Sequence, residues 1–366
     1  MSLTLNSRET LAAIEQRFAE RQAGGPPKPR RSRRWWAVSI SLSIIIALVL
    51  AVVGLGIYLT QSVYSALTIL PDDEVFPSAE TRPSVPAVDP DTNILILGTD
   101  SRNGLGDEDA LTDGGATGQR SDTMLLVNVA GDGSGVAVIS LMRDLWVPIP
   151  GRTTAKINAA MSWGGIPLAV ETVESLLGQR IDHVAVVDFE GFADIATALG
   201  GVPVQSPVAF QSKNMPGYSF TEGENIVEGE RALAFVRERY SFVDGDYQRV
   251  RNQRSFLEGA FSRLVDAGGQ LDVIRITNTM RAAASNLTVD AGVTLPWMIE
   301  FGSSVAAVPS DKIASFTLPT LGTGTSADGQ SIVILDEALT QELADTLTSG
   351  DVVEFARTHD LADAGS

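Results

Sequence analysis

The sequence contains no cysteine and only two histidines among its 366 residues. The absence of cysteine excludes disulfide bonds, iron–sulfur clusters, cysteine nucleophiles and cysteine-ligated zinc. His183 and His359 give little basis for a Ser–His–Asp triad or a multi-histidine metal site. His183 opens an apolar run and is expected to be structural. Neither GxxxxGK[ST] nor GxGxxG occurs, so neither a P-loop nor a dinucleotide site is supported.

Positive charge is scarce and unevenly distributed, with 27 Lys/Arg against 45 Asp/Glu. Residues 1–34 hold eight Lys/Arg and three Glu, whereas the remainder holds 19 Lys/Arg and 42 Asp/Glu, a formal charge of −23. Residues 35–59 (WWAVSISLSIIIALVLAVVGLGIYL) carry no charge, and about 20 apolar residues span a bilayer core. The positive-inside rule therefore predicts a cytoplasmic tail over 1–34, a transmembrane helix over 35–59 and an extracellular remainder.

A cleaved signal peptide is the alternative interpretation of this N-terminal region. The charge-free run is longer than the apolar part of a signal peptide, and no small-x-small cleavage site follows it. Residues 7–22 have a short helical pattern, which GGPPKP ends. Five prolines between residues 71 and 90 predict a Pro-rich extracellular tether over residues 60–90. A catalytic domain over 91–351 and a C-terminal tail over 352–366 complete the predicted organisation.

Short apolar runs alternate with helical patterns after residue 91. AGDGSG is a tight turn, so the runs on either side of it, 123–129 and 136–142, are expected to form an antiparallel hairpin. This alternation predicts a layered α/β/α domain with a central mixed sheet. The expected strands are 93–98, 123–129, 136–142, 183–189 and 331–335, and the expected helices include 168–178, 190–201 and 336–347.

Charged residues follow or precede the first three predicted strands. Asp100 lies after the first strand, Asp122 before the second and Arg143 after the third. If the first and third strands run parallel, all three residues lie at one edge of the sheet, beside a loop rich in Gly and Asp. This placement suggests a metal and phosphate site. The alternative is that strand ends are simply polar, with Arg143 paired to Asp144.

Five arginines fall within the 20 residues FVRERYSFVDGDYQRVRNQR, residues 235–254. The arginine fork matches phosphate and carboxylate groups. Arg237 and Arg239 are two apart, so an extended backbone directs both to one side. We expect the helix that begins near Glu228 to end just before Arg237, with both guanidinium groups projecting from its end.

A turn at residues 244–246 is expected to lead into a second helix that runs to about residue 266, with Asp246 as its N-cap. Arg249 and Gln253 are four apart and therefore share a face of that helix. The clustering of arginines at one helix end and the next helix start predicts an anion site. The alternative is a solvated face of salt bridges with Glu238, Glu258 and Asp244.

Eight motifs then carry a resemblance to the LytR–CpsA–Psr family, over about residues 93–351. They occur in the family's order and spacing: NILILGTDSR, QRSDTMLLVNV, SLMRDLWVPIPG, KINAAMSWGG, IDHVAVVDFEGF, ALGGVPV, LAFVRER and DGDYQRVRNQ. The resemblance implies a transferase that moves a wall polysaccharide or teichoic acid from a polyprenyl-pyrophosphate carrier to peptidoglycan, leaving a phosphodiester.

The resemblance also implies roles for individual residues. Asp100 and Asp122 resemble the carboxylates of a Mg²⁺ site, with Mn²⁺ as an alternative metal. Arg102 matches the family motif DSR, although the resemblance gives it no definite role. The residues that resemble pyrophosphate-binding side chains are Arg120, Arg143, Arg237, Arg239, Arg249 and Gln253. Catalytic roles are expected for Asp122, Arg143, Arg237 and Arg239.

Phosphoryl transfer fits these residue types, because catalysis there rests on positioning and on neutralising charge. A carboxylate near the metal, with Asp122 as the candidate, would accept the proton of the attacking sugar hydroxyl. The prenyl chain requires an apolar groove, which we expect between helices 168–178 and 190–200. The alternatives are a phosphatase or pyrophosphatase on the same lipid, and a non-catalytic binder of anionic polymers or a regulator. Nucleic-acid binding is disfavoured, because the predicted exterior is strongly acidic.

Overall fold

The computed structural model describes residues 7–22, 67–84, 91–99, 121–264, 272–283, 286–349 and 351–361. The chain divides into two compact units, residues 1–58 and 59–366. In the first unit the described residues form helix α1 (Ser7–Gln22), as their pattern predicts. Within the described ranges, no helix has the length and apolar character needed to cross a membrane. The predicted transmembrane helix, residues 35–59, lies outside these ranges.

A seven-stranded mixed sheet forms the centre of the second unit, in the order β1-β12-β7-β2-β3-β4-β13. Three neighbouring pairs are parallel (β1 with β12, β2 with β7, β4 with β13), and the other three are antiparallel. The strands are β1 (Thr68–Leu70), β2 (Thr92–Thr99), β3 (Ser121–Val129), β4 (Val136–Leu141), β7 (His183–Asp188), β12 (Leu287–Asp290) and β13 (Ile313–Thr317).

The first three predicted strands occupy adjacent places in this sheet. β2 pairs antiparallel with β3 and β3 with β4, so β2 and β4 run in the same direction, as required for the predicted edge. Gly98 pairs with Thr123 and Thr99 with Ser121, so Asp122 is the extra residue of a β-bulge. Bulges are common next to active sites. All six residues of β4 are buried, which explains its continuous apolar run.

Alternating residues of the strands pack into hydrophobic cores on the two faces of the sheet. Leu95 and Leu97 pack on one face with α3 (Asp72–Val75), α4 (Ala159–Leu177), α10 (Glu337–Ser349) and α11 (Val352–Thr358). Val147 and Val333 bring a four-stranded second sheet to the same core. Its order is β14-β15-β5-β6, with β5 (Leu145–Pro148), β6 (Thr154–Lys156), β14 (Thr320–Thr325) and β15 (Ser331–Leu335).

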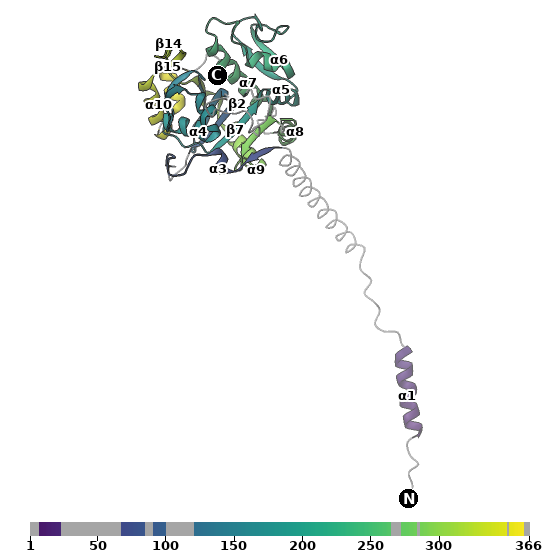
Figure 1. Ribbon diagram of the computed structural model, residues 1–366. Coiled ribbons are helices and arrows are strands. Elements are labelled where there is room, and N and C mark those ends of the chain that lie inside the picture. The colour runs from purple at the N-terminus through teal and green to yellow at the C-terminus, as the bar shows by residue number, and fades with distance from the viewer. Residues whose placement is uncertain are drawn as a thin grey trace. The chain divides into compact units, whose positions relative to one another are not determined.

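The opposite face of the central sheet carries the remaining helices (Figure 1). These are α5 (Phe189–Ala198), α6 (Gly229–Val236), α7 (Asp246–Leu264), α8 (Val273–Ala283) and α9 (Leu295–Ala307). Two small hairpin pairs, β8 (Val202–Ser206) with β11 (Gly223–Val227) and β9 (Phe210–Gln211) with β10 (Ser219–Phe220), and the 3-10 turn η2 (Ser310–Lys312) complete the unit. The predicted mixed central sheet with helices on both faces is thereby confirmed.

Helix α4 begins earlier than the predicted helix 168–178 and contains a break. Gly164 and Gly165 have non-helical dihedral angles, and Gly165 adopts φ +65°, a value that favours glycine. Pro167 follows this break at the start of the second segment, where a missing amide hydrogen costs little. The predicted glycine stop is confirmed, because Gly178 ends the helix with φ 65°.

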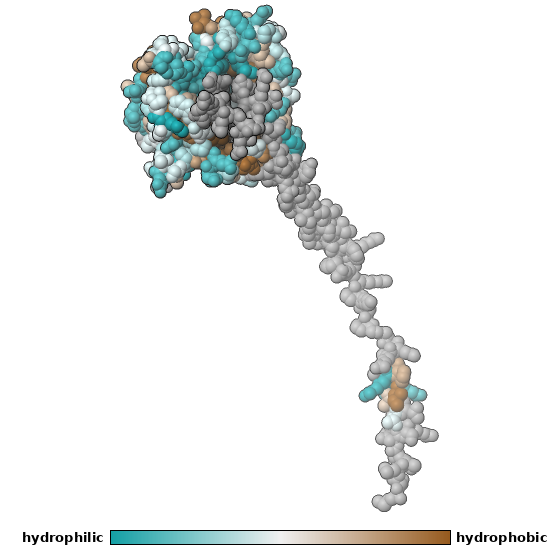
Figure 2. Space-filling view, in the orientation of Figure 1, coloured by the Kyte–Doolittle hydropathy of each residue, from teal (hydrophilic) through white to brown (hydrophobic). Residues whose placement is uncertain are grey.

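The prediction of an apolar groove between helices 168–178 and 190–200 is wrong. Val184 and Val186 of β7 belong to the core that contains α4, whereas Val187 packs in the core that contains α5. The two helices therefore lie on opposite faces of one sheet and cannot line a common groove. The visible described surface of this unit is mostly hydrophilic, with hydrophobic residues scattered across it (Figure 2).

Two predicted boundaries also change. Residues 67–84, assigned to the tether, pack onto the domain: β1 pairs with β12, and the Arg82 side chain forms an ion pair with Glu174 at 2.7 Å. Residues 352–358, assigned to the tail, form α11, whose Val353 and Phe355 are buried in the core. The sequence pattern missed both because each contributes only a short apolar segment.

Candidate functional site

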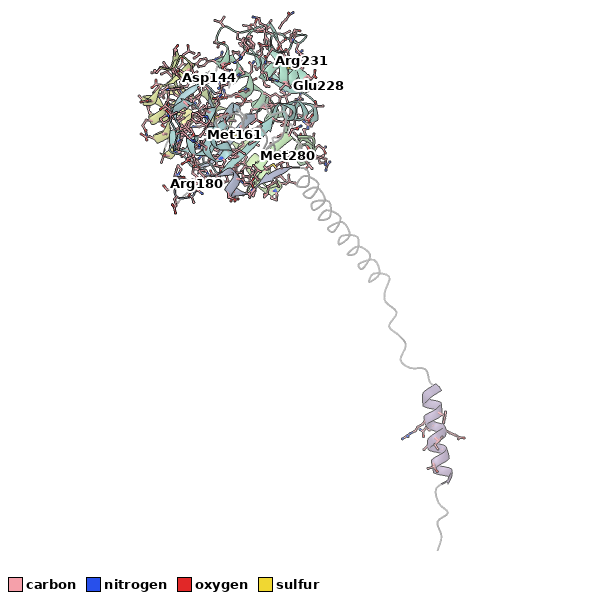
Figure 3. All side chains as sticks on the ribbon, viewed as in Figure 1. Asp144, Met161, Arg180, Glu228, Arg231 and Met280 are labelled. Carbon is pink, nitrogen blue, oxygen red and sulfur yellow. The ribbon has the colours of Figure 1, made fainter. Side chains whose placement is uncertain are left out.

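The ends of β2 and β4 and the start of β3, which carry or precede the predicted site residues, lie together along one edge of the central sheet, where these strands end or begin. β2 ends at Thr99, β3 begins at Ser121, and β4 ends two residues before Arg143. The side chain of Asp122 is not among those described, and Asp100, Arg102 and Arg120 lie outside the described residues. Asp144, at this edge, and Arg180, which precedes β7, lie toward opposite ends of the unit (Figure 3).

Arg143 and Asp144 form the centre of a tight turn between β4 and β5. The Leu145 amide donates to the Met142 carbonyl at 2.9 Å, which closes the turn. Arg143 Nε lies 3.5 Å from Asp144 Oδ2. The pairing of Arg143 with Asp144, which the sequence offered as the alternative to a metal and phosphate site, is therefore present. Arg143 Nε also lies 3.4 Å from Asp246 Oδ2 on α7, a second carboxylate that the alternative did not include.

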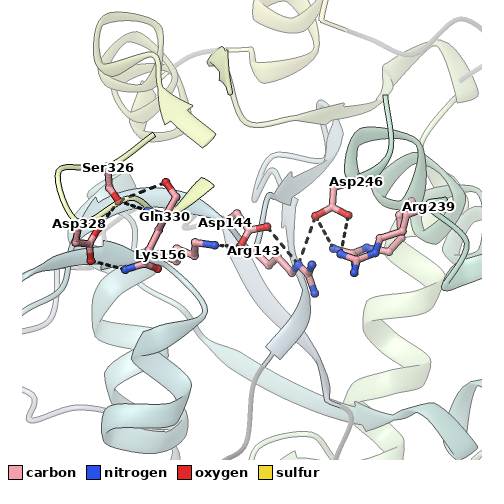
Figure 4. A network of polar contacts seen from close by, with 9 residues as sticks. Arg143, Asp144, Lys156, Arg239, Asp246, Ser326, Asp328 and Gln330 are labelled. Carbon is pink, nitrogen blue, oxygen red and sulfur yellow. Dashed lines mark hydrogen bonds and ion pairs between the residues drawn. The ribbon is translucent and has the colours of Figure 1, made fainter. Parts of the chain in front are cut away.

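Asp246 is the centre of an arginine cluster, defined as Arg143, Arg239, Arg249 and Asp246 (Figure 4). Its carboxylate lies 3.5 Å from Arg239 Nη1 and 3.4 Å from Arg249 Nη2. Burial opposes ionisation of Asp246, but the guanidinium groups of Arg249, Arg143 and Arg239 outweigh it and lower its pKa. The sequence suggested Asp246 only as an N-cap and missed its central place.

The arginine cluster carries more positive than negative charge. Three guanidinium groups face one carboxylate at separations of 3.4–3.5 Å, longer than the roughly 2.7–2.9 Å of charge-assisted hydrogen bonds. The side chain of Arg249 is 6% exposed and that of Arg143 is 19% exposed, so solvent screens them incompletely. Fixed arginine side chains of this kind suit a phosphate or pyrophosphate group, so this end of the sheet is a candidate anion site.

Helix α6 ends where the sequence predicted, at Val236, with Arg237 as its C-cap. Two side chains of α7 hold that end: Asn252 Nδ2 donates to the Phe235 carbonyl at 3.0 Å, and Gln253 Nε2 donates to the Val236 carbonyl at 3.4 Å. These contacts fix the end of α6 against the helix that carries Arg249. Gln253, predicted to bind pyrophosphate, therefore has a positioning contact in this structure.

Glu238, which lies between Arg237 and Arg239, has contacts that the sequence did not predict. Glu238 is fully buried and accepts hydrogen bonds at 2.6–3.1 Å from Ser212 Oγ and from the amides of residues 213, 214, 239 and 241. Burial opposes its ionisation, but these hydrogen bonds outweigh that effect and lower its pKa. These partners of Glu238 are a hydroxyl group and backbone amides, not the arginine side chains that the salt-bridge alternative predicted.

A lysine extends the polar row beyond Arg143. Lys156 Nζ on β6 lies 2.9 Å from Asp144 Oδ1. Figure 4 shows the row from Arg239 through Asp246, Arg143 and Asp144 to Lys156. Nothing in the sequence placed Lys156 here, because β6 reaches this row only through the pairing of β5 with β6.

The other two arginines of residues 235–254 have different surroundings. Arg251 pairs with Asp244 at a solvent-exposed position, as the salt-bridge alternative predicted. Arg254 is 1% exposed and donates to Ser140 Oγ at 2.8 Å and Thr317 Oγ1 at 3.0 Å. These two hydrogen bonds join β4 to the last residue of β13.

The side chains of the residues predicted to bind Mg²⁺, Asp100 and Asp122, are not among those that the structure describes. No group of three or more His, Cys, Asp or Glu side chains suited to a metal occurs in the described part of the chain. Asp100 follows Thr99 directly and Asp122 follows Ser121, and Thr99 pairs with Ser121 across the two strands. Mg²⁺ usually takes few carboxylates and completes its shell with water and phosphate oxygens, so the predicted pair of aspartates has suitable chemistry for it.

Comparison with known proteins identifies relatives of the whole second unit. Residues 70–349 match the LytR_cpsA_psr family. The polyisoprenyl-teichoic acid–peptidoglycan teichoic acid transferase TagU of Bacillus subtilis is 30% identical over 326 residues, with 87% of this chain and 98% of TagU covered. The TagU of Enterococcus faecalis is 29% identical over 306 residues, covering 82% of this chain and 92% of that protein.

Solved structures give the same result. The crystal structure of Bacillus subtilis TagV has a TM-score of 0.60 and 27% identity, covering 70% of this chain and 96% of TagV. The structure of TagT bound to LI-WTA has a TM-score of 0.56 at 23% identity, covering 75% of this chain and 98% of TagT, and supports the fold alone. Because residues 70–349, most of its length, match the family model, the chain belongs to the LytR–CpsA–Psr family.

Proposed function

We propose that the chain is a membrane-anchored, extracellular phosphotransferase. It moves a glycopolymer, a teichoic acid or wall polysaccharide, from a polyprenyl-pyrophosphate carrier to a hydroxyl group of peptidoglycan. The family and the transferase names of the TagU relatives support this reaction class. The observation that carries the proposal is the arginine cluster at the sheet edge, where Arg143, Arg239 and Arg249 surround a single carboxylate.

The arginine cluster suits the charge of the substrate. A pyrophosphate diester carries about two negative charges, and more charge develops on the leaving phosphate during transfer. Guanidinium groups fixed before the reaction stabilise that charge without reorganising. Arg143, Arg239 and Arg249 would bind the pyrophosphate directly, and Arg237 projects from the same helix end. Arg102 and Arg120 are proposed to join them.

The reaction balances as a simple displacement. The oxygen of a peptidoglycan hydroxyl attacks the phosphorus that bears the glycopolymer and forms a new phosphorus–oxygen bond. The bond from that phosphorus to the bridging oxygen breaks, and polyprenyl monophosphate leaves with the electron pair. The hydroxyl proton passes to a carboxylate, for which Asp122 at the β-bulge is the candidate.

Mg²⁺, or Mn²⁺ in its place, is the proposed metal, and Asp100 and Asp122 are the proposed protein ligands. When bound, the ion would neutralise pyrophosphate charge. The pairing of Thr99 with Ser121 supports this proposal, because Asp100 and Asp122 follow these two residues directly in the sequence.

The proposed location is the cell membrane, with residues 1–34 in the cytoplasm and the folded unit outside. The charge-free run at residues 35–59 and the basic residues before it support this orientation. A reporter fused after residue 366 should be active only outside the cytoplasm. Protease added to intact protoplasts should remove the exterior unit, and protection of that unit would overturn the orientation.

The activity is tested with the full-length chain in lipid vesicles, supplied with a labelled lipid-linked glycan, Mg²⁺ and peptidoglycan. Label that becomes attached to peptidoglycan through a phosphodiester supports the transferase. Release of free phosphate without attachment would identify a hydrolase of the same lipid. Binding of the lipid with neither product would identify a non-catalytic binder.

A further inference from the structure

The arginine turn, defined as residues 237–241, carries two of the proposed substrate-binding side chains outside regular secondary structure. It follows the last residue of α6 and precedes α7 at Asp246. Loop backbones are ordinarily more mobile than helices and strands. Substrate-binding groups that stabilise a transition state must nevertheless be held close to their working positions. A specific set of contacts must therefore hold this turn.

The Glu238 carboxylate supplies the centre of that set. Its Oε2 accepts from Ser212 Oγ and from the amides of Lys213 and Asn214 at 2.6–3.1 Å. Its Oε1 accepts from the amides of Arg239 and Ser241, both at 3.0 Å. One side chain thus joins the backbone of residues 212–214 to the backbone on which Arg239 lies.

Further contacts join the same two segments. Asn214 Nδ2 donates to the Arg237 carbonyl at 3.1 Å, Lys213 Nζ donates to the Tyr240 carbonyl at 2.9 Å, and Ser241 Oγ donates to the Gln211 carbonyl at 2.6 Å. Tyr240 lies under Arg239, with the guanidinium carbon 4.5 Å from the ring centroid. Each of these three hydrogen bonds has one partner in the arginine turn. Two of them are accepted by backbone carbonyls of the turn, those of Arg237 and Tyr240.

We propose that Glu238 is a positioning residue for substrate binding: its buried carboxylate fixes the backbone of the arginine turn, so that Arg237 and Arg239 lie on one side as a preformed pyrophosphate-binding pair. The inference rests on the proposed function. The geometry favours it, because Glu238 is fully buried whereas Arg237 and Arg239 on either side of it are partly exposed. Glu238 itself touches no substrate.

A positioning role and a simple charge effect predict opposite changes in anion binding for Glu238→Gln. Glu238→Gln removes one negative charge near an anion site, which by itself would strengthen anion binding. If Glu238 positions the turn, binding instead weakens, because the amide group presents N–H donors where the carboxylate accepted hydrogen bonds. Glu230→Gln is the matched control. Glu230 is an exposed residue of α6 whose carboxylate accepts from Tyr218 Oη at 2.6 Å.

The experiment measures binding of geranyl pyrophosphate with Mg²⁺ to the full-length chain in nanodiscs, by calorimetry, beside the thermal unfolding midpoint. Glu238→Gln should weaken binding about tenfold or more, as displaced binding groups do, while Glu230→Gln leaves binding unchanged or slightly tighter. In an Arg239→Ala background the effect of Glu238→Gln should shrink, because the two residues act on the same contact.

Asn214→Ala provides a second variant should Glu238→Gln fail to fold, because Asn214 is exposed and donates to the Arg237 carbonyl. It should weaken binding in the same direction with little change in the unfolding midpoint. Equal binding in Glu238→Gln and wild type, or effects of Glu238→Gln and Arg239→Ala that simply add, would overturn the positioning role. No binding of geranyl pyrophosphate by the wild-type chain would instead overturn the proposed function and the inference with it.

Discussion

Two regions of the second unit place arginine against a carboxylate. They differ in the number of arginines per carboxylate and in the distance between the charged groups. Near the start of the unit, Arg82 donates twice to Glu174 Oε1 at 2.7 and 2.9 Å and also to the Ile181 carbonyl. The two side chains are 6% and 2% exposed. In the arginine cluster, three arginines share Asp246 at 3.4–3.5 Å, and Arg239 is 30% exposed.

The difference separates a structural ion pair from the proposed binding site. At Arg82 each charge has its counter-charge at hydrogen-bond distance, so no net charge remains for a ligand. At Asp246 three guanidinium groups share one carboxylate at separations too long for strong hydrogen bonds, and Arg143 also lies near Asp144. Charge balance and closeness, rather than the mere presence of arginine, therefore distinguish the two regions.

Arg82→Ala should produce the largest effect, on stability. It leaves Glu174 buried without its counter-charge, which typically costs about 3–5 kcal/mol of unfolding free energy. Urea denaturation of the variant and of Arg152→Ala, an exposed control, measures the loss. Equal stability of the two variants would show that the buried pair contributes nothing specific.

Arg239→Ala should leave the fold intact and reduce transfer by about 10²-fold, as loss of one preorganised donor typically does. Arg239→Lys should restore little, because a single ammonium group cannot replace the planar fork. Transfer rates beside unfolding midpoints test both variants, and Arg237→Ala should behave in the same way. Near-normal transfer in Arg237→Ala and Arg239→Ala would reduce the cluster to a solvated charged surface.

In Asp100→Asn, the metal and the lipid pyrophosphate should increase each other's binding affinity less than in the wild-type chain. Ligand and metal that share a site tighten each other's binding, typically by about 5- to 150-fold, and this variant removes one negative charge from the proposed metal site. Lipid affinity without metal should stay equal or rise, because repulsion of the phosphates falls. Calorimetric titration with and without Mg²⁺ measures this, and identical wild-type titrations would remove Asp100 from a metal–pyrophosphate site.

Arg251→Ala should have the smallest effect. Its partner Asp244 is exposed, and exposed ion pairs contribute less than about 1 kcal/mol to stability. Transfer should remain within about twofold of wild type, because Arg251 contacts Asp244 and Gln248, which lie outside the arginine cluster. A loss of transfer as large as that of Arg239→Ala would place Arg251 in the substrate site.

The helix ends around the arginines were predictable, because local sequence determines them. The apolar pattern that ends at Val236 and the Asp-Gly-Asp turn before Tyr247 fix where α6 stops and α7 starts. The antiparallel pairing of β3 with β4 also followed from one short turn. Such features depend on neighbouring residues, which a single sequence displays.

The contacts that build the site were less predictable, since they join distant segments. Glu238 lies between two arginines in the sequence, which favours a salt bridge, yet its partners come largely from residues 212–214. Lys156 meets Asp144 only through strand pairing. The opposite placement of α4 and α5 depends on which side of β7 each helix packs, and residue patterns do not specify that side.

The pairing of β1 with β12 has a consequence for the solubility of shortened chains. β1 covers the outer edge of β12, whose Leu287 and Val289 are buried. A chain that starts at residue 91 lacks β1 and exposes the backbone edge of β12, which can pair with the same edge of another molecule. It would aggregate through this edge, whereas a chain that starts before Leu67 retains a capped sheet.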